Sequence, residues 1–263
     1  MTTPRTSWLV LPTYNEVENL EALVRSALPV LRASAPGEAH VLIVDDCSPD
    51  GTGLVADRLA AEFEEVHVLH RGEKGGLGQA YLAGFEAALE FGAGYVLEMD
   101  CDFSHDPAEL ARLLAAAEGG ADVVLGSRYV QGGGTVLWSA GRRALSRAGC
   151  WYARRLLGLR LWDLTGGFKC FRREVLEAID LPSVRSKGYA FQVELTYRAA
   201  RRGFVIQEVP ILFRDRQEGA SKMSTRIVAE AMLRVPALRF AERQGAPGVD
   251  VRLGHAAGSP RPV

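Results

Sequence analysis

The chain has 263 residues, of which 48% are hydrophobic and 24% charged, and its formal net charge is −1. These values are ordinary for a globular protein and exclude a disordered or collagen-like chain, and the near-zero charge gives no indication of a nucleic-acid binder. The charge is unevenly distributed, because residues 1–136 carry 21 acidic and 8 basic side chains, whereas residues 137–263 carry 11 acidic and 23 basic ones. The two halves, with net charges of −13 and +12, are therefore expected to face different partners.

Neither a transmembrane span nor a signal peptide is expected. The longest stretch without a charged residue, 129–141, has 13 residues with four glycines, which is too short to cross a bilayer. Residues 1–8 contain no apolar run before a small-residue cleavage site. The cysteines at 47, 101, 150 and 170 are widely spaced and form no CxxC pair, which favours buried free thiols in a reducing cytosol.

Apolar runs alternate with helical periodicity through the first half of the chain. Strands are predicted at residues 8–11, 40–44, 66–69, 95–99 and 122–125, and helices at 17–31, 52–63, 77–91 and from Asp106, where Pro107 and Glu109 complete a capping box. This alternation predicts an α/β fold, a mainly parallel sheet with helices on both faces. Ligands bind such sheets at the carboxyl ends of the strands, so the loops after those strands should carry the site.

The pattern changes in the second half. We expect a basic helix at 139–159, a loop at 162–168, helices at 174–179 and 189–202, and a strand at 204–213. A last amphipathic helix should begin near Ser224 and be interrupted at Pro236. Residues 244–263 are rich in glycine and proline and should form a disordered tail, which leaves residues 1–243 as one domain.

The most informative motif is Glu98-Met-Asp100-Cys-Asp102, at the end of the fourth predicted strand. Two carboxylates two residues apart in extended backbone lie on the same side, so both can reach one hard divalent cation, which prefers oxygen ligands. Water and a substrate diphosphate would complete the coordination. A solvated acidic turn is the alternative, but acids that directly follow a hydrophobic strand favour the metal site.

A glycine-rich segment, Gly75-Gly-Leu-Gly78, precedes the third predicted helix. A dinucleotide fingerprint would need a third glycine where Tyr81 stands, so a dehydrogenase is disfavoured. Two alternatives remain: a tight strand-to-helix turn, or a phosphate site made by backbone N–H groups and Lys74.

Polar loops follow the first two strands. In Pro12-Thr-Tyr-Asn-Glu16, Tyr14 could pack on a base ring, and in Asp45-Asp46-Cys-Ser-Pro-Asp50-Gly-Thr52, Asp46 could accept hydrogen bonds from a nucleobase or ribose. Asn15 and Asp50 could equally be helix caps, which is the usual role of such residues.

The ordered set of motifs PTYNE, VDDCSPDGT, KGGLGQA, MDCDFSHDP, GSRY, DLTGGFKCFRREVL and EGASKMS resembles the family 2 glycosyltransferases, and more narrowly the polyprenyl-phosphate (dolichol-phosphate) mannose synthases. The resemblance covers residues 8–239. It implies a single nucleotide-sugar-binding domain of the GT-A type, with a donor half at about 1–136 and an acceptor half at about 137–243. It also implies inverting transfer of mannose from GDP-mannose to a polyprenyl phosphate.

The resemblance carries over residue by residue. The donor residues it implies are Pro12, Tyr14, Glu16, Val44, Asp46, Lys74, Asp100, Cys101, Asp102 and Phe103. The metal, Mg²⁺ or Mn²⁺, would be held by Asp100 and Asp102, with Ser104 standing where some relatives have a ligating glutamine. The phosphate-binding cations it implies are Arg128, Arg216 and Lys222, which Arg214 could join. Asp102 and Arg128 are the residues expected to act in catalysis.

The chemistry agrees with the residues available. Negative charge grows on the diphosphate leaving group, which a divalent cation would stabilise as a Lewis acid. The acceptor phosphate monoester already carries roughly −1.5 to −2 near neutral pH, so no strong general base is needed. We therefore interpret Glu194, where some related sugar transferases place a base, as structural. The loop Asp163–Phe168 could be a simple turn, but its glycines permit close backbone approach, so we expect it to shape the cleft between donor and acceptor.

The helix predicted at residues 139–159 gives separate evidence about the acceptor. Leu145, Ala148, Tyr152, Leu156 and Leu159 share one face, and Arg143, Arg147 and Arg154 lie opposite. A basic amphipathic helix suits an anionic membrane surface, although a core-packing helix with a solvated basic face is the ordinary alternative. We expect a peripheral protein on the cytoplasmic face of the membrane, held there with a separate integral membrane partner.

Two further functions stay open from the residues alone. One is the same transfer with another hexose, such as glucose from UDP-glucose, because base and sugar contacts depend on geometry. The other is a non-catalytic sugar-nucleotide-binding subunit, against which the presence of both Asp100 and Asp102 argues.

Overall fold

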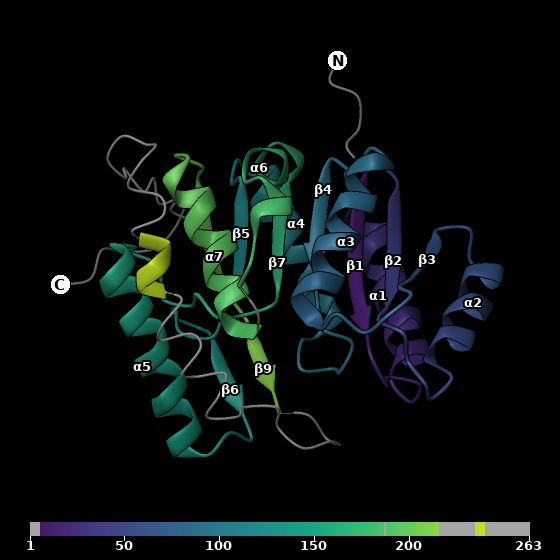
Figure 1. The fold of residues 1–263 in the computed structure, drawn as a ribbon, viewed down its shortest axis with the longest axis horizontal. Coiled ribbons are helices and arrows are strands. Elements are labelled where there is room, and N and C mark those ends of the chain that lie inside the picture. The colour runs from purple at the N-terminus through teal and green to yellow at the C-terminus, as the bar shows by residue number, and fades with distance from the viewer. Residues whose placement is uncertain (1–5, 187, 216–234, 240–263) are drawn as a thin grey trace.

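The computed structural model describes residues 6–186, 188–215 and 235–239. A seven-stranded sheet with the order β3-β2-β1-β4-β7-β5-β8 forms its centre (Figure 1). The strands are β1 (Ser7–Thr13), β2 (Ala39–Asp45), β3 (Val66–His70), β4 (Tyr95–Glu98), β5 (Val123–Ser127), β7 (Lys169–Arg172) and β8 (Ile206–Pro210). All neighbouring strands pair in parallel except β7, which runs antiparallel between β4 and β5. The predicted mainly parallel sheet is confirmed.

Helices cover both faces of this sheet. They are α1 (Leu20–Ser34), α2 (Thr52–Glu62), α3 (Leu77–Glu90), α4 (Leu110–Glu118), α5 (Ala140–Leu157), α6 (Arg173–Ala178) and α7 (Gly188–Arg201). One buried apolar cluster joins the sheet to α1, α2 and α4, and a second joins it to α3, α6, α7 and the end of α5. Strand residues alternate between the two clusters: Leu9 and Leu11 of β1 belong to the first, and Trp8 and Val10 to the second.

Two strands differ from the prediction. Residues 169–172, for which no element was predicted, form β7. Only Cys170 and Phe171 are apolar there, and the flanking charges hide the strand in the sequence. The single strand predicted at 204–213 is instead two strands, since β8 ends at Pro210 and the chain crosses to a second sheet. In that sheet β9 (Leu212–Arg214) pairs in parallel with the unpredicted β6 (Gly134–Val136).

The helix expected from Asp106 begins with a 3₁₀ turn, Pro107–Glu109, that continues into α4. The Asp106 carboxylate accepts a hydrogen bond from the Ala108 N–H at 2.9 Å, as an N-cap should. The Glu109 carboxylate accepts from Arg112 at 2.7 Å rather than closing the predicted capping box.

None of the helices in the described ranges is long and apolar enough to cross a membrane. The amphipathic helix predicted from Ser224 lies outside the described residues except for the helical segment 235–239, and so does the predicted tail at 244–263. The parallel strands β1, β2, β3 and β4 end at one edge of the sheet, and the loops that follow them carry the site described next.

Candidate active site

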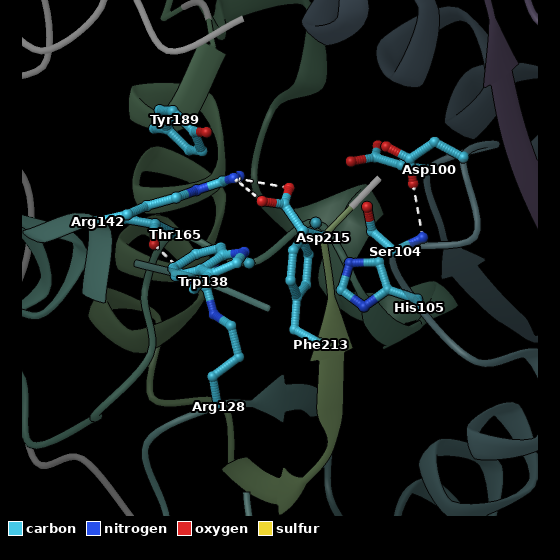
Figure 2. Close-up of a pocket in the computed structure, with 13 residues that line it drawn as sticks. Asp100, Ser104, His105, Arg128, Trp138, Arg142, Thr165, Tyr189, Phe213 and Asp215 are labelled. Carbon is cyan, nitrogen blue, oxygen red and sulfur yellow. Dashed lines mark hydrogen bonds and ion pairs between the residues drawn. The ribbon is translucent and has the colours of Figure 1, made fainter. Parts of the chain in front are cut away.

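Three adjoining cavities meet at the acidic motif. The Tyr14 pocket, of about 260 Å³, is lined by residues of the β1 and β2 loops, the start of α3, and Asp100 with Cys101. The Arg142 pocket, of about 110 Å³, is lined by Asp100, Asp102 and residues of the second half of the chain (Figure 2). The outer groove, of about 640 Å³, is lined by Asp102, Phe103, Arg214 and residues near α1 and β6. Asp100 thus borders the first two cavities, and Asp102 borders the second and third.

The fold holds both carboxylates of the motif in place. Asp100 Oδ1 accepts a hydrogen bond of 2.9 Å from the hydroxyl of Tyr81 on α3, and Asp102 Oδ1 accepts one of 2.9 Å from the Ser104 N–H. The turn from Asp102 to Ser104 has a left-handed backbone at Phe103, with φ of 56°. Such a conformation is uncommon for a bulky residue and is typical of functional loops.

The residues present fit a hard divalent cation. Asp100, Asp102 and Ser104 all line the Arg142 pocket and offer only oxygen ligands, which Mg²⁺ and Mn²⁺ accept. Within the described ranges no cluster of three or more acidic, histidine or cysteine side chains could hold a metal. Asp100, Asp102 and Ser104 could therefore supply part of the coordination of such a cation.

The Tyr14 pocket brings together seven of the residues that the sequence assigned to the donor: Pro12, Tyr14, Glu16, Asp46, Lys74, Asp100 and Cys101. The Lys74 ammonium lies 3.5 Å from the centroid of the Tyr14 ring. An aromatic face and a cation at the end of a parallel sheet suit the base and phosphates of a nucleotide. Phe103 lies in the outer groove instead.

Val44 is a predicted donor residue that lines none of these three cavities. Its side chain is fully buried in the sheet and belongs to the core cluster under α3, where a Cβ on Gly84 would lie only 2.9 Å from it. Gly84 therefore allows α3 to pack directly on β2. Val44 and Asp46 are two residues apart and share one side of the strand, but α3 covers Val44, whereas Asp46 lies beyond the end of β2 and borders the pocket.

The glycine-rich segment before α3 binds a carboxylate of the protein itself. Asp46 accepts hydrogen bonds from the N–H groups of Gly75 and Gly76, at 3.0 and 2.7 Å, and from the Arg71 guanidinium. Of the two alternatives for these backbone N–H groups, the phosphate site is disfavoured, because both already donate to Asp46. Lys74 remains directed to the pocket.

Arg128 forms a buried ion pair with Asp163. Its Nε and Nη2 donate to the two carboxylate oxygens at 2.7 Å each, and Nη2 also donates to the Thr165 hydroxyl at 2.8 Å. Burial alone would raise the pKa of Asp163, but the charge and hydrogen bonds of Arg128 hold it below its usual value. Arg128 lines the Arg142 pocket, as its predicted phosphate-binding role requires, but most of its guanidinium is engaged by Asp163.

The loop after α5 closes the same pocket. Thr165, Gly166 and Gly167 line it, and a Cβ on Gly167 would lie 3.6 Å from both carboxylate oxygens of Asp100. This placement, in which the loop backbone approaches the acidic motif closely, agrees with the cleft-shaping role expected for the loop.

The sequence of this chain matches a known protein family. The family model described as "Glycosyl transferase family 2" matches residues 8–180. The chain belongs to this family.

Two relatives of this family 2 glycosyltransferase are half identical to it. A polyprenol monophosphomannose synthase of Mycolicibacterium smegmatis is 50% identical over 228 residues, which cover 86% of this chain and 84% of the relative. An undecaprenyl-phosphate mannosyltransferase of Micrococcus luteus is 50% identical over 245 residues, which cover 93% and 98%.

A solved structure confirms the fold. Glucosyl-3-phosphoglycerate synthase of Mycobacterium tuberculosis, in complex with Mn²⁺, UDP and glucosyl-3-phosphoglycerate, matches with a TM-score of 0.64 at 20% identity and covers 93% of this chain and 81% of that chain. The predicted single domain of the GT-A type is thereby confirmed.

The sequence reasoning missed Arg142 and Asp215 as pocket residues of this glycosyltransferase. Arg142 Nη1 donates to both Asp215 carboxylate oxygens at 2.7 Å, and its guanidinium lies 4.3 Å from the Trp138 ring centroid (Figure 2). In the sequence Arg142 is one of six arginines between Trp138 and Trp162. Only its place in the first turn of α5 brings it to the pocket.

His105 was also missed. It is 2% exposed, stacks on Phe168 with ring centroids 4.8 Å apart, and meets the Phe213 ring edge-on at 5.0 Å. Burial lowers the pKa of His105 to about 4, so the imidazole is neutral at physiological pH. The motif SHDP contains this residue, but nothing in its spacing indicates an aromatic stack.

Of the three other predicted phosphate-binding residues, the structure describes only Arg214. Arg214 lines the outer groove, and its backbone N–H donates to the Ser104 carbonyl at 3.0 Å, which joins β9 to the acidic motif. Arg216 and Lys222 lie outside the described residues.

Glu194 is buried and accepts hydrogen bonds from the Ser186 N–H and the Arg198 guanidinium, at 3.1 and 2.5 Å, in agreement with its structural interpretation.

The apolar face predicted for α5 is only partly buried. Tyr152 and Leu156 pack against the core, whereas Leu145 is 47% exposed. The helix buries Cys150, Ala153 and Leu157 instead, because only its second half lies against the sheet layer. Trp151 and Trp162, 60% and 53% exposed, add aromatic surface beside its arginines.

Proposed function

We propose that the chain transfers mannose from GDP-mannose to a polyprenyl phosphate, with inversion at the anomeric carbon. The observation that carries the proposal is the position of Asp100, which borders both the Tyr14 pocket and the arginine-lined Arg142 pocket. A donor diphosphate and an acceptor phosphate bound in these pockets would meet at the acidic motif. The names of the two half-identical relatives support mannose as the sugar and a polyprenyl phosphate as the acceptor.

The Tyr14 pocket would bind the nucleoside. Tyr14 would contact the base, and Lys74, whose ammonium lies over the Tyr14 ring, offers a positive charge for the diphosphate. Asp46, fixed by Arg71 and the Gly75 and Gly76 N–H groups, forms a rigid wall of the pocket. A rigid pocket lowers the entropy that donor binding costs.

Asp100 and Asp102 would hold Mg²⁺ or Mn²⁺ at the donor diphosphate, with Ser104 beside them. A divalent cation bound there supplies Lewis-acid stabilisation of the negative charge that develops on the departing diphosphate. The protein contributes the orientation, since Tyr81 and the Ser104 N–H each fix one of the two carboxylates. The solved relative with Mn²⁺ and UDP supports this choice of metal.

The Arg142 pocket would orient the acceptor. An acceptor phosphate oxygen attacks the anomeric carbon, the bond from that carbon to the donor phosphate oxygen breaks, and the electron pair leaves with GDP. The acceptor oxygen is already ionised, so the protein needs no group to remove a proton. The neutral His105 and the paired Glu194 agree with a reaction that uses no general base.

The same reaction with glucose from UDP-glucose is the second candidate. We favour mannose because both half-identical relatives are named for it. We place the enzyme on the cytoplasmic face of a membrane, with α5 at the lipid surface and a separate integral membrane protein as its partner. Binding by an amphipathic helix alone is reversible, which a partner would offset.

Asp102→Asn tests the catalytic assignment. Purified protein with GDP-mannose, undecaprenyl phosphate and Mg²⁺ should form a mannosyl lipid, and Asp102→Asn should lower kcat by at least about 100-fold, because leaving-group stabilisation supplies several kcal/mol. Thermal unfolding should show an intact fold. The matched variant Asp57→Asn, on the exposed surface of α2, should retain full turnover. Unchanged turnover in Asp102→Asn would contradict the assignment.

A further inference from the structure

The position of Arg142 makes it an anion site. It is the third residue of α5, whose N-terminus is capped by the Ser139 hydroxyl, which accepts from the Arg142 N–H at 3.2 Å. The N-terminus of a helix is electropositive, so an arginine in its first turn adds positive charge where the helix already carries it. The combination requires a neighbouring anion, and Asp215 provides one.

The two arginines of the pocket differ in how firmly their anions are held. Arg128 and Asp163 side chains are 5% and 0% exposed, whereas those of Arg142 and Asp215 are 21% and 31% exposed. Both carboxylate oxygens of Asp215 accept from the same nitrogen of Arg142, Nη1. Arg142 Nε is buried without a hydrogen-bond partner among the described residues. The Arg142 fork is therefore not saturated, and its partly exposed partner can be exchanged for another anion.

Asp215 lies where such an exchange would matter. It lines both the Arg142 pocket and the outer groove, and in Figure 2 its carboxylate lies between Arg142 and the acidic motif. Its backbone N–H donates to the Val136 carbonyl at 3.2 Å, which ties the residue to β6. A carboxylate tethered in this way stays next to the pocket after its side chain has turned away.

We propose that Asp215 is an internal competitor of the acceptor phosphate, which pairs with Arg142 in the empty enzyme and returns to it as the product leaves. This inference rests on the proposed function. The acceptor is a phosphate monoester with a charge of roughly −1.5 to −2. Transfer converts one of its anionic oxygens into the ester bond to the sugar, so the product is a diester with a single negative charge.

Competition by Asp215 weakens the binding of every phosphate ligand by the same factor. The consequence of this weaker binding differs between substrate and product. The monoester binds Arg142 more strongly through its greater charge and can displace Asp215. The diester, which binds more weakly from the start, is displaced by Asp215 and departs. Asp215 therefore raises the product concentration that is needed to occupy the site.

Calorimetric titration of the full chain with GDP and Mg²⁺ present tests the proposal. The probes are geranyl phosphate, a soluble monoester, and its methyl diester. Asp215→Asn should tighten the binding of both by about fivefold, the upper range for a partly exposed ion pair. Arg142→Gln should weaken monoester binding, and in the Arg142→Gln background Asp215→Asn should have no effect. Glu177→Gln, which removes a carboxylate from an exposed pair with Arg173, is the matched control and should bind as wild type.

Other results of these titrations would each overturn a specific part of the proposal. Weaker or unchanged binding in Asp215→Asn would overturn the competitor role, and so would equal tightening in the Arg142→Gln background, which would indicate general repulsion rather than competition. If Arg142→Gln weakens the monoester while Asp215→Asn does not change it, only the role of Asp215 fails. If wild type binds no monoester, or Arg142→Gln binds it as well as wild type, the proposed acceptor site fails too.

Discussion

At the scale of single residues, two buried ion pairs support the site. Arg128 pairs with Asp163 below the Arg142 pocket, and Lys169 of β7 lies 3.5 Å from Glu98, the residue two before Asp100. Burial raises the pKa of Glu98 and lowers that of Lys169. Removing one member of such a pair leaves the other charge buried and uncompensated, which costs far more than the pair contributes.

Asp163→Asn should therefore lower the free energy of unfolding at pH 7 by about 3–5 kcal/mol, because the buried Arg128 charge loses its counter-ion. The pKa of Asp163 is lowered in the folded protein, so its stabilisation is present above the ordinary aspartate pKa and is lost as the pH falls through the folded-state pKa. The difference between wild type and variant should shrink below about pH 4.

Urea unfolding between pH 3 and pH 7 measures this difference. Glu177→Gln, in an exposed pair, should change the stability by less than about 0.5 kcal/mol at any of these pH values. A difference for Asp163→Asn that stays constant as the pH falls below 4 would contradict the assignment to its ionised carboxylate.

The sequence predicts the residues of local motifs better than those joined by the fold. Asp100 and Asp102 follow one strand, and the i, i+2 spacing alone places both carboxylates on one side. Arg142 and Asp215 are 73 residues apart, and neither has a local pattern that indicates the other. Asp46 was assigned to the site, but the glycine N–H groups that it binds come from a segment about 30 residues later, so its partners could not be predicted.

At the scale of elements, periodicity identifies the strands and helices that repeat regularly. The strands β1 to β5 and the helices between them follow apolar runs and were predicted closely. The strand β7 was missed because its end residue Lys169 is charged yet 1% exposed, and only the partner Glu98 on the neighbouring strand makes that burial possible. For α5, the helix was predicted correctly, but which of its faces meets the core depends on where the sheet ends.

The arginines of α5 provide a test of membrane binding. Arg143 and Arg147 are exposed, and the Arg154 guanidinium lies 4.3 Å from the ring centroid of the exposed Trp162. Each cation near an anionic membrane contributes about 1 kcal/mol, so Arg143/Arg147/Arg154→Gln should weaken binding to phosphatidylglycerol-containing liposomes by about 100-fold. Flotation at low salt measures the bound fraction, which for wild type should be lower with neutral lipid.

A matched variant separates surface position from net charge. Arg25, Arg32 and Arg58 lie on α1 and α2, and Arg25/Arg32/Arg58→Gln changes the net charge by the same amount. This variant should float as wild type does. Equal loss of binding in both triple variants would show a charge effect without a role for α5.

At the scale of the whole molecule, the near-zero net charge is the sum of two opposed halves. The acidic half contributes the Tyr14 pocket and the acidic motif, and the basic half contributes Arg142 and the arginines of α5. The sequence already shows this division of charge, and the fold explains how the two halves contribute to one site. The sheet places the acidic motif at the boundary, where a nucleotide diphosphate on one side and a lipid phosphate on the other would meet.

The most direct test of the central claim is a donor panel. Purified protein with undecaprenyl phosphate and Mg²⁺ or Mn²⁺ is supplied separately with GDP-mannose, UDP-glucose and GDP-glucose, and kcat/KM is measured from sugar incorporated into lipid. We expect GDP-mannose to give the highest kcat/KM, by about tenfold or more, with a mannosyl phospholipid of inverted configuration. Transfer from UDP-glucose alone would contradict the assignment of the donor, and the absence of transfer from every donor would contradict the assignment as an enzyme.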